Sequence, residues 1–318
     1  MSEQMNAAYF DEFGDLNQIK TGTFDRPELG EGEGEVLVKV EAAGVNPVDA
    51  AVARGMLNEV IPTEFPAIPG WDMAGVVKER GYSARRFDEG DEVYAYARRP
   101  VVEHGTFAEY VAIPESYLSQ KPQSISIEEA AGIPLVGLTA YQSLFQFGNL
   151  QKGQTLLVLG GSGGVGTLAI QMAKAVGASV IAVAGENNQD YMTKLGAEET
   201  IDYSAGNVGN AVREIAPEGI DFILHCSRGD SLQQSIDTLK SGGQLISITN
   251  SDPKRPDDIQ FQYVFVEPNA KQLNHIREMV DDDKIRVPVS KTYSLEETDQ
   301  ALKDIESLHS RGKTVVIP

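Results

Sequence analysis

The chain has 318 residues, and its 41% hydrophobic and 23% charged content is typical of a folded globular protein and argues against long disorder. Its length exceeds the roughly 250–300 residues that a single hydrophobic core usually reaches, which favours two domains. The formal net charge of −20 argues against binding of nucleic acid or anionic lipid, since both need clustered Lys and Arg, and it indicates solubility more than substrate.

The first region, up to about Lys121, is rich in Gly, Pro and Val and contains short alternating runs. In residues 35–41, Val36, Val38 and Val40 fall on one face, as in a half-buried strand. Similar runs separated by Gly and Pro turns predict further strands at 73–77, 91–95 and 107–113. We expect a small, mostly antiparallel β-domain, partly closed into a barrel.

From about residue 124 to 250, strands and helices alternate. Residues 155–159 and 180–183 are β-branched, apolar runs without a polar face, which suits strands covered on both sides. Strands are also predicted at 222–225 and 244–249, the latter after a helix-ending turn at 240–243. Short turns between alternating elements predict an α/β fold with a parallel, doubly wound sheet. Helical spacing between the first two strands is shown by Leu168, Ala169, Met172, Ala173 and Val176.

The last region changes pattern again. It predicts a helix at 271–281, a strand at 287–289, a helix at 295–309 and a closing strand at 313–317. We expect this tail to pack on the N-terminal domain. The predicted division is therefore a first domain at 1–123, a second domain at 124–264, and a return to the first domain at 265–318.

A glycine-rich turn follows the strand at 155–159 directly and opens a helix. Glycines let such a turn bend tightly and bring its backbone close to a pyrophosphate, while the helix N-terminus offers free N–H groups to the anion. In this strand–loop–helix setting the turn predicts a dinucleotide site, and a turn that binds nothing is the alternative. The G-x-G-x-x-G pattern is formed by Gly161, Ser162, Gly163, Gly164, Val165 and Gly166.

The end of the next strand carries conflicting signals about the coenzyme. An acid there binds the ribose 2′-hydroxyl of NAD and repels the 2′-phosphate of NADP. Ala184 occupies this strand end, which leaves room for a phosphate, but no Lys or Arg follows before Lys194. Gly185 and Glu186 come next, and Glu186 is either a ribose ligand or a solvated loop acid. We favour NADPH and keep NADH open.

The sequence predicts neither export nor a membrane span. No apolar run reaches the roughly 20 residues that a membrane span needs, and residues 1–11 have neither a basic patch nor an apolar signal core. The one cysteine, Cys226, excludes an internal disulfide and fits a reducing compartment. We therefore expect a cytoplasmic protein that does not bind membranes.

Several further motifs, in this order and spacing, resemble the medium-chain dehydrogenase/reductase superfamily in its zinc-independent quinone oxidoreductase branch. The resemblance covers essentially the whole chain and includes the glycine loop. It implies a GroES-like catalytic domain, a Rossmann cofactor domain, an active site in the cleft between them, and a homodimer. The motifs are AGVNPVD (43–49), IPGWDMAG (68–75), GTFAEY (105–110), PLVGLTAY (134–141), KLGA (194–197), IDY (201–203), FVEP (265–268) and RGK (311–313).

Zinc-dependent relatives hold a catalytic metal with two Cys and one His. Here Asn46 stands where the first Cys is expected, and Trp71 stands where the His is expected. A zinc site needs three or four converging ligands, so we expect no metal in this chain. The four histidines are scattered and are interpreted as structural or surface residues: His104, His225, His275 and His309.

Without a Lewis acid, the protein must depend on positioning and on hydrogen bonds to the developing oxyanion. By resemblance, Asn46 lies beside the nicotinamide and orients it or binds a substrate carbonyl; an Asx turn before Pro47 is the alternative. Thr139 is expected to touch the nicotinamide from a helix start, although helix capping also explains it. Asp49 is interpreted as a cap or cation partner. Ala51 replaces a Tyr of several relatives, so we expect solvent to supply the proton.

The remaining coenzyme contacts are implied by the same resemblance. Tyr203 matches a residue near the adenosine phosphate, and several residues are expected at strand ends that face the dinucleotide. Arg311 and Lys313 match contacts near the nicotinamide, with surface charges as the alternative. The strand-end and nicotinamide residues are Cys226, Ser227, Ile248, Thr249, Phe265 and Val266.

The expected function is an NAD(P)H-dependent, zinc-independent reductase of quinones or α,β-unsaturated carbonyls. Delocalisation in these acceptors spreads the negative charge and lessens the need for a metal. Two alternatives stay open: an alkenal, enoyl or carbonyl reductase of narrow specificity, and a non-catalytic protein that binds NADPH or nucleic acid on the same scaffold. The net charge argues against the nucleic-acid alternative.

Overall fold

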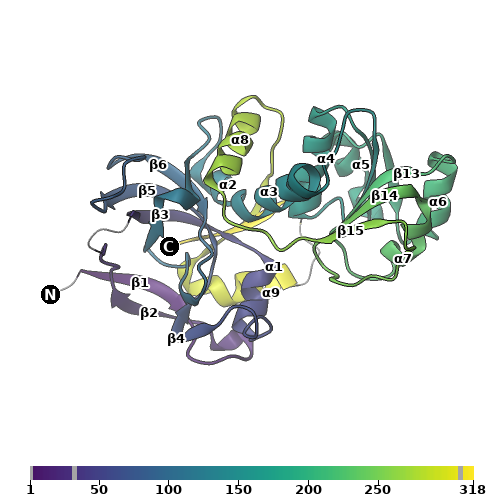
Figure 1. The fold of residues 1–318 in the computed structure, drawn as a ribbon. Coiled ribbons are helices and arrows are strands. Elements are labelled where there is room, and N and C mark those ends of the chain that lie inside the picture. The colour runs from purple at the N-terminus through teal and green to yellow at the C-terminus, as the bar shows by residue number, and fades with distance from the viewer. Residues whose placement is uncertain (1–2, 31–33, 307–310) are drawn as a thin grey trace. The chain divides into compact units, whose positions relative to one another are not determined.

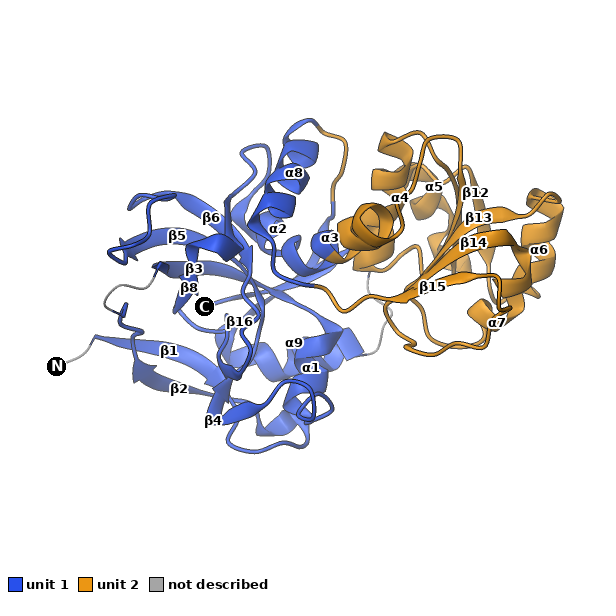
Figure 2. Ribbon diagram, in the orientation of Figure 1, with its two compact units in different colours: residues 1–138, 267–282, 287–318 blue, residues 139–266, 283–286 orange. Residues whose placement is uncertain are grey.

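Two units, each with its own main sheet, make up the computed structural model, which describes residues 3–30, 34–306 and 311–318. Unit 1 comprises Met1–Leu138, Glu267–Asp282 and Val287–Pro318, and unit 2 comprises Thr139–Val266 and Asp283–Arg286 (Figure 2). The first boundary lies 15 residues beyond the expected one at 123, and the second lies at Val266 rather than 264. The division into functional domains made from the sequence stays a prediction.

The main sheet of unit 1 is organised around the long strand β3 (Glu35–Val45), seen in Figure 1. Val36, Val38 and Val40 are buried as expected, but Leu37 is only 1% exposed, so β3 is covered on both faces. The pairing is antiparallel except between β16 and β17. The order is β16 (Val289–Ser294), β17 (Lys313–Ile317), β3, β5 (Asp72–Arg80), β6 (Glu92–Tyr96) and β9 (Leu118–Gln120), with β8 (Tyr110–Pro114) also on β3.

Unit 1 also has two small sheets and several short helices. The sheets pair β1 (Gln4–Tyr9) with β2 (Lys20–Asp25), and β4 (Thr63–Ile68) with β7 (Val102–His104). The α-helices that begin in this unit are α1 (Pro47–Ala53), α2 (Ile127–Ala131), α3 (Pro134–Tyr141), α8 (Ala270–Asp281) and α9 (Thr298–Glu306). The 3₁₀ turns are η1 (Leu16–Gln18), η2 (Glu115–Tyr117) and η6 (Leu295–Glu297).

Unit 2 contains a six-stranded parallel sheet whose spatial order is the third, second, first, fourth, fifth and sixth strand of the sheet. This order places a switch of direction between β10 (Thr155–Leu159) and β13 (Ile220–His225), where ligands of doubly wound sheets bind. The other strands are β11 (Ser179–Ala184), β12 (Glu199–Asp202), β14 (Leu239–Ser247) and β15 (Gln260–Tyr263).

Helices cover this sheet because its strands are apolar on both faces. On one face Leu157 and Leu159 pack in a core with Val208 and Val212 of α6, and on the other α4 contacts β10 and β11. The helices are α4 (Gly164–Ala175), α5 (Gln189–Leu195), α6 (Val208–Ile215) and α7 (Ser231–Ser235). Shorter turns are η4 (Glu186–Asn188), η5 (Ile236–Thr238) and the π-helical η3 (Gln142–Phe147).

Some predicted element boundaries are wrong. The strand expected at 107–113 begins at Tyr110, because Phe107 and Ala108 pair with β1 instead. Residues 240–243 do not end a helix but lie within β14, after η5 has ended at Thr238. The strand expected at 287–289 is β16, which runs from Val289 to Ser294. The helix expected at 295–309 starts as a 3₁₀ turn, and its last residues, 307–309, lie outside the described residues.

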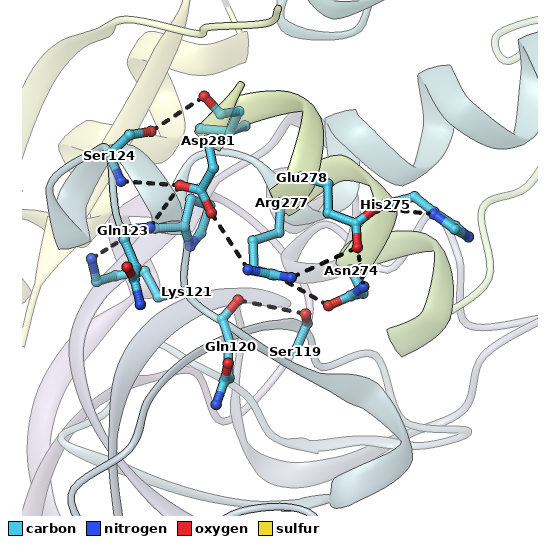
Figure 3. A network of polar contacts seen from close by, with 12 residues as sticks. Ser119, Gln120, Lys121, Gln123, Ser124, Asn274, His275, Arg277, Glu278 and Asp281 are labelled. Atoms are coloured by element: carbon cyan, nitrogen blue, oxygen red, sulfur yellow. Dashed lines mark hydrogen bonds and ion pairs between the residues drawn. The ribbon is translucent and has the colours of Figure 1, made fainter. Parts of the chain in front are cut away.

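A polar network fixes α8 within unit 1 and is drawn in Figure 3. Asp281, the last residue of α8, accepts backbone N–H groups of Gln123 and Ser124 at 2.8 and 3.1 Å. Arg277 lies one turn earlier and forms an ion pair with Asp281 at 3.5 Å. The segment at 267–282 thus returns to the first part of the chain, as expected for the tail. Within the described ranges, no helix combines the length and apolarity needed to cross a bilayer.

Candidate active site

The glycine loop lies where the sequence predicts it, between β10 and α4. The backbone N–H groups of Gly160 and Gly161 both donate to Val183 O, at 3.0 and 2.9 Å, which attaches the loop to β11. A Cβ on Gly166 would overlap Gly160 O and lie 2.7 Å from Gly161 Cα, so the loop itself requires glycine there. A Cβ on Gly163 would meet only Gly160 O, at 3.7 Å. Gly163, the N-cap of α4, therefore leaves space for a ligand.

The carboxyl ends of the strands in unit 2 bring most of the predicted coenzyme residues to one edge of the sheet. Each lies in the turn after a strand or in the first turn of the helix that follows it: Gly161, Ser162 and Gly163 after β10, Gly164, Val165 and Gly166 at the start of α4, Gly185 and Glu186 after β11, Tyr203 after β12, Cys226 and Ser227 after β13, Ile248 and Thr249 after β14, and Phe265 and Val266 after β15.

Hydrogen bonds and close contacts join these turns to one another. Thr249 Oγ1 donates to Ser227 O at 3.0 Å, and Cys226 N donates to Leu159 O at 2.9 Å. Gly160, with φ of +94°, approaches the Cys226 carbonyl so closely that a Cβ would lie 3.3 Å from its oxygen. The turns after β10, β13 and β14 therefore form one connected surface.

Two exposed side chains at this edge, Glu186 and Tyr203, lie in the turns after β11 and β12. Tyr203 is 55% exposed, and a Cβ on Gly185 would lie 3.4 Å from its hydroxyl. Glu186 is exposed at the start of η4, and none of the described ion pairs involves it. An exposed aromatic ring beside a small residue suits stacking of a base, and an exposed carboxylate suits either of the roles considered for Glu186.

His225 was interpreted from sequence as a structural or surface histidine, and the structure buries it to 4% exposure at the end of β13. Its Nδ1 lies 3.0 Å from Ser247 Oγ and 3.3 Å from Thr249 Oγ1. Burial lowers its pKa to about 4, so the ring is neutral near pH 7. Its Nε2 has no hydrogen-bond partner among the described residues, and neither does Ser227 Oγ.

These two unpaired atoms make His225 a residue of the edge that sequence reasoning missed. Its position as the last residue of a strand, directly before Cys226, was the available signal. Burial also raises the pKa of the Cys226 thiol to about 12, so the thiol is protonated near pH 7 and is a poor nucleophile or metal ligand.

Asn46 lies in unit 1 at the centre of what we call the buried amide network, which comprises Asn46, Asp49, Asp72 and Lys313. Asn46 is the N-cap residue of α1 and is fully buried. Its Nδ2 donates to Asp72 Oδ2 at 2.9 Å, and its Oδ1 accepts from Lys313 Nζ. Lys313 Nζ also donates to Val45 O at 2.8 Å.

Lys313 is only 2% exposed, so its interpretation as a surface charge is wrong. β17 places its side chain inside unit 1, where the ammonium meets Val45 O and Asn46 Oδ1. Its predicted contact with the coenzyme, like that of Asn46, stays a prediction. Arg311, by contrast, is exposed.

The carboxylates of the network have shifted pKa values because they are buried. Desolvation raises the pKa of Asp49 to about 8. The backbone N–H of Asn46, which donates to Asp49 Oδ2 at 2.8 Å, opposes this rise because it stabilises the carboxylate. This bond confirms that Asp49 caps the first turn of α1. Desolvation also raises the pKa of Asp72 to about 6, although the positive charge of Lys313 acts to lower it. The pKa of Lys313 is lowered, again by burial.

Two other predicted residues have clear places. Trp71 is 4% exposed and packs edge-to-face on Tyr96, with ring centroids 6.1 Å apart, so it is a buried aromatic of unit 1. Thr139 is buried in the second half of α3, so its expected position at a helix start is wrong. Pro134 begins that helix, because proline has no N–H to lose at the first position.

Zinc does not fit the donor set in unit 1. The Asn46 amide is already bound to an ammonium and a carboxylate, and Trp71 has no lone pair to offer a metal. In the part of the chain that the structure describes, no three or more His, Cys, Asp or Glu side chains converge as metal ligands.

Two family models match the chain. One is described as the alcohol dehydrogenase GroES-like domain and matches residues 32–123, and the other, zinc-binding dehydrogenase, matches residues 195–316. The description of the second model names zinc, whereas Asn46 and Trp71 occupy the two positions at which the sequence comparison expected metal ligands.

Individual proteins are similar over nearly the whole chain. The mitochondrial NAD(P)H oxidoreductase RTN4IP1 of Danio rerio is 33% identical over 89% of this chain and 83% of its own length. The chloroplastic NADPH-dependent alkenal/one oxidoreductase of Arabidopsis thaliana is 32% identical over 99% of this chain and 80% of its own. Among solved structures, the quinone oxidoreductase from Coxiella burnetii has a TM-score of 0.87 at 30% identity, covering 99% of this chain and all of that chain.

Proposed function

Because the chain belongs to the medium-chain dehydrogenase/reductase family, alongside its quinone oxidoreductases, and is therefore an oxidoreductase, we propose that it uses NADPH to reduce quinones or α,β-unsaturated carbonyls without zinc. The observation that carries the proposal is the glycine loop. Its backbone closes tightly at Gly166 but leaves open space at Gly163, at the N-terminus of a 12-residue helix.

The dinucleotide would be held by the carboxyl edge of unit 2. The α4 N-terminus and its loop would bind the pyrophosphate, and Tyr203 would face the adenosine end. His225 Nε2 and Ser227 Oγ are buried at this edge and have no hydrogen-bond partner among the described residues. Buried polar atoms usually have a partner, which favours a hydrogen bond from these atoms to a ribose hydroxyl. When bound, the reduced nicotinamide supplies hydride; Thr139, Phe265 and Val266 are proposed to contact it.

NADPH is preferred over NADH on two grounds. β11 ends in Ala184, where an acid would repel the 2′-phosphate, and one similar protein is named as NADPH-dependent. The exposed Glu186 opposes this preference. The affinities for both NADPH and NADH should therefore be measured.

The acceptor class follows from the groups present in unit 1. The negative charge that forms on a reduced quinone or enone is delocalised, so hydrogen bonds can stabilise it where an alkoxide would need a metal. Asn46 retains one N–H that neither Asp72 nor Lys313 uses, and this N–H suits a substrate carbonyl. Similar proteins named as quinone and alkenal/one oxidoreductases support both acceptors. Solvent is proposed as the proton donor.

Assembly and location are also proposals. We propose a homodimer in the cytoplasm, with small molecules as partners and neither nucleic acid nor membrane as ligand. The names of similar proteins place those proteins in mitochondria and chloroplasts, so the cytoplasmic location needs its own measurement.

The experiment mixes the purified protein with NADPH and either 1,4-benzoquinone or a 2-alkenal and follows NADPH absorbance. We expect saturable loss of NADPH with at least one acceptor. Tight coenzyme binding without turnover of either acceptor would contradict the proposal and favour a non-catalytic role.

A further inference from the structure

We propose that Lys313 and Asp72 are positioning residues that hold the side-chain amide of Asn46 in one orientation, with its free N–H directed to the acceptor. The inference rests on the proposed function for its consequence in catalysis, but its geometric part stands on unit 1 alone. Lys313 bonds Asn46 Oδ1, and Asp72 Oδ2 accepts from Asn46 Nδ2 at 2.9 Å.

The two partners permit only one orientation of the amide. An ammonium has donors and no acceptor, so the atom that it bonds must be the carbonyl oxygen. A carboxylate has only acceptors when ionised, so the atom facing Asp72 must be the NH₂ group. A flip of Asn46 would bring NH₂ against Lys313 and oxygen against Asp72, and both hydrogen bonds would be lost inside a fully buried site.

The partners are themselves held in place by other segments of unit 1. Leu135 N donates to Asp72 Oδ1 at 2.8 Å, and Thr106 Oγ1 donates to the Asp72 carbonyl at 2.9 Å. Lys313 Nζ is fixed by Val45 O at 2.8 Å. Each charged partner thus has a second contact of its own, which a network built for orientation requires.

The charges also polarise the amide that joins them. Lys313 Nζ lies 3.9 Å from Asp72 Oδ2, and Asn46 bonds both groups. A cation on the amide oxygen draws electron density from the nitrogen, so the remaining N–H becomes a stronger donor in this low-dielectric interior. Such a donor would stabilise the negative charge that develops on a carbonyl oxygen during reduction.

If Lys313 and Asp72 only stabilised the fold, stability and turnover would change together in their variants. Replacement of a buried ion pair by neutral groups is often harmless to stability, whereas removal of one partner is costly. Lys313→Met therefore serves as the single variant, and Lys313→Met/Asp72→Asn serves as the neutral pair. Lys121→Met is the matched control, because Lys121 is another buried lysine of unit 1 that bonds Pro122 O and Ile125 O at 3.0 and 3.1 Å.

Turnover gives the first readout. We expect Lys313→Met to lower kcat about 100-fold, as misplacement of a catalytic contact does. Because Lys313 Nζ is bonded to Val45 O and Asn46 Oδ1, we expect this lysine to act through Asn46 rather than through a coenzyme contact of its own. The NADPH Kd of Lys313→Met should therefore stay within about threefold, and Lys121→Met should retain its kcat. The double variant should recover thermal stability but not kcat. Recovery of kcat in the double variant, or equal kcat in Lys313→Met and Lys121→Met, would overturn the proposal.

The second readout needs no substrate. In ¹⁵N-labelled wild-type protein, the side-chain NH₂ signals of Asn46, assigned by their loss in Asn46→Ala, should shift in Lys313→Met and not in Lys121→Met. Unchanged signals in Lys313→Met would contradict the fixed orientation. If the wild type reduces neither acceptor but these signals shift as expected, the proposed function fails while the positioning of Asn46 stands.

Discussion

The carboxyl edge of unit 2 and the buried amide network of unit 1 are built in opposite ways. The edge consists of turns that each follow one strand directly, and it leaves polar atoms unpaired among the described residues, at His225 and Ser227. The network joins residues 267 positions apart, Asn46 and Lys313, and within the described part of the chain its side-chain polar atoms are paired with one another or with nearby backbone, except Asp49 Oδ1. Unpaired atoms suit binding of a ligand, whereas paired atoms suit positioning of one group.

The difference teaches where substitutions should act. Changes at the edge should alter coenzyme affinity, and changes in the network should alter the rate of reduction or the dependence of stability on pH. Variants of each region that change only the quantity assigned to that region would support the comparison. A network variant that changes coenzyme affinity would contradict it.

The largest effect on binding is expected from Gly166→Ala. Its Cβ would overlap Gly160 O, which belongs to backbone that cannot move aside cheaply. We expect a loss of about 3 kcal/mol in the free energy of unfolding of unit 2, and at least a 100-fold weaker NADPH Kd from distortion of the loop. Urea unfolding and fluorescence titration with NADPH measure the two quantities. A variant with wild-type affinity would contradict the tight closure of the loop.

Gly163→Ala should separate binding from folding. Since its Cβ meets only Gly160 O, at 3.7 Å, the protein itself should tolerate it, with an unchanged free energy of unfolding. A pyrophosphate at the α4 N-terminus would collide with the new methyl group, which we expect to cost about 2 kcal/mol, or roughly thirtyfold in Kd. If NADPH binds this variant as it binds the wild type, the dinucleotide does not lie on this loop.

Glu186→Lys tests the choice of coenzyme. A lysine in place of this exposed acid should attract the 2′-phosphate and raise the NADPH-to-NADH ratio of affinities about tenfold. Glu198→Lys is the matched control, since it makes the same charge change at the other end of the sheet, before β12. Titration of both coenzymes gives the ratio. Equal shifts in both variants would mean that net charge, not a contact by residue 186, sets the preference.

Asp49→Asn should have the smallest effect, seen only in the dependence of stability on pH. The folded pKa is raised from 3.8 to about 8, so the folded state holds this proton more tightly than the unfolded chain does. The stability that it contributes is present in full below about pH 4 and is lost as the pH rises toward 8. Asn mimics the protonated acid and does not titrate. Both proteins keep Asp72 and Lys313, so their difference isolates Asp49.

Relative to Asp49→Asn, the wild type should therefore lose at least about 1 kcal/mol of its free energy of unfolding between pH 5 and pH 8. Urea unfolding at each pH measures the difference. A difference that is constant between these pH values would show that Asp49 stays ionised in the folded protein.

The two regions also differ in how far the sequence predicts them. The glycine loop and the strand-end residues were predicted because the motif and the strand that precedes it are neighbours in sequence, and parallel strands bring their carboxyl ends to one edge. The contacts of His225 with Ser247 and Thr249 were not predicted, because these residues come from the next strand and the turn after it.

The buried amide network lay beyond sequence reasoning. Asn46 was singled out and Asp49 was recognised as a cap, but the bond between Asn46 and Lys313 depends on the pairing of β17 with β3. Nothing local to Lys313 distinguishes a buried ammonium from a surface charge. The strand boundary at Tyr110 failed for the same reason, since Phe107 and Ala108 bind a strand about 100 residues earlier.

The central claim, reduction of a conjugated acceptor without zinc, is tested most directly by one preparation measured in two ways. Elemental analysis determines transition metal per chain, and stopped-flow absorbance follows NADPH oxidation by 1,4-benzoquinone in the same sample, with and without a chelator. The account predicts turnover in protein that lacks stoichiometric metal, unchanged by the chelator. Activity that rises and falls with bound zinc would contradict it.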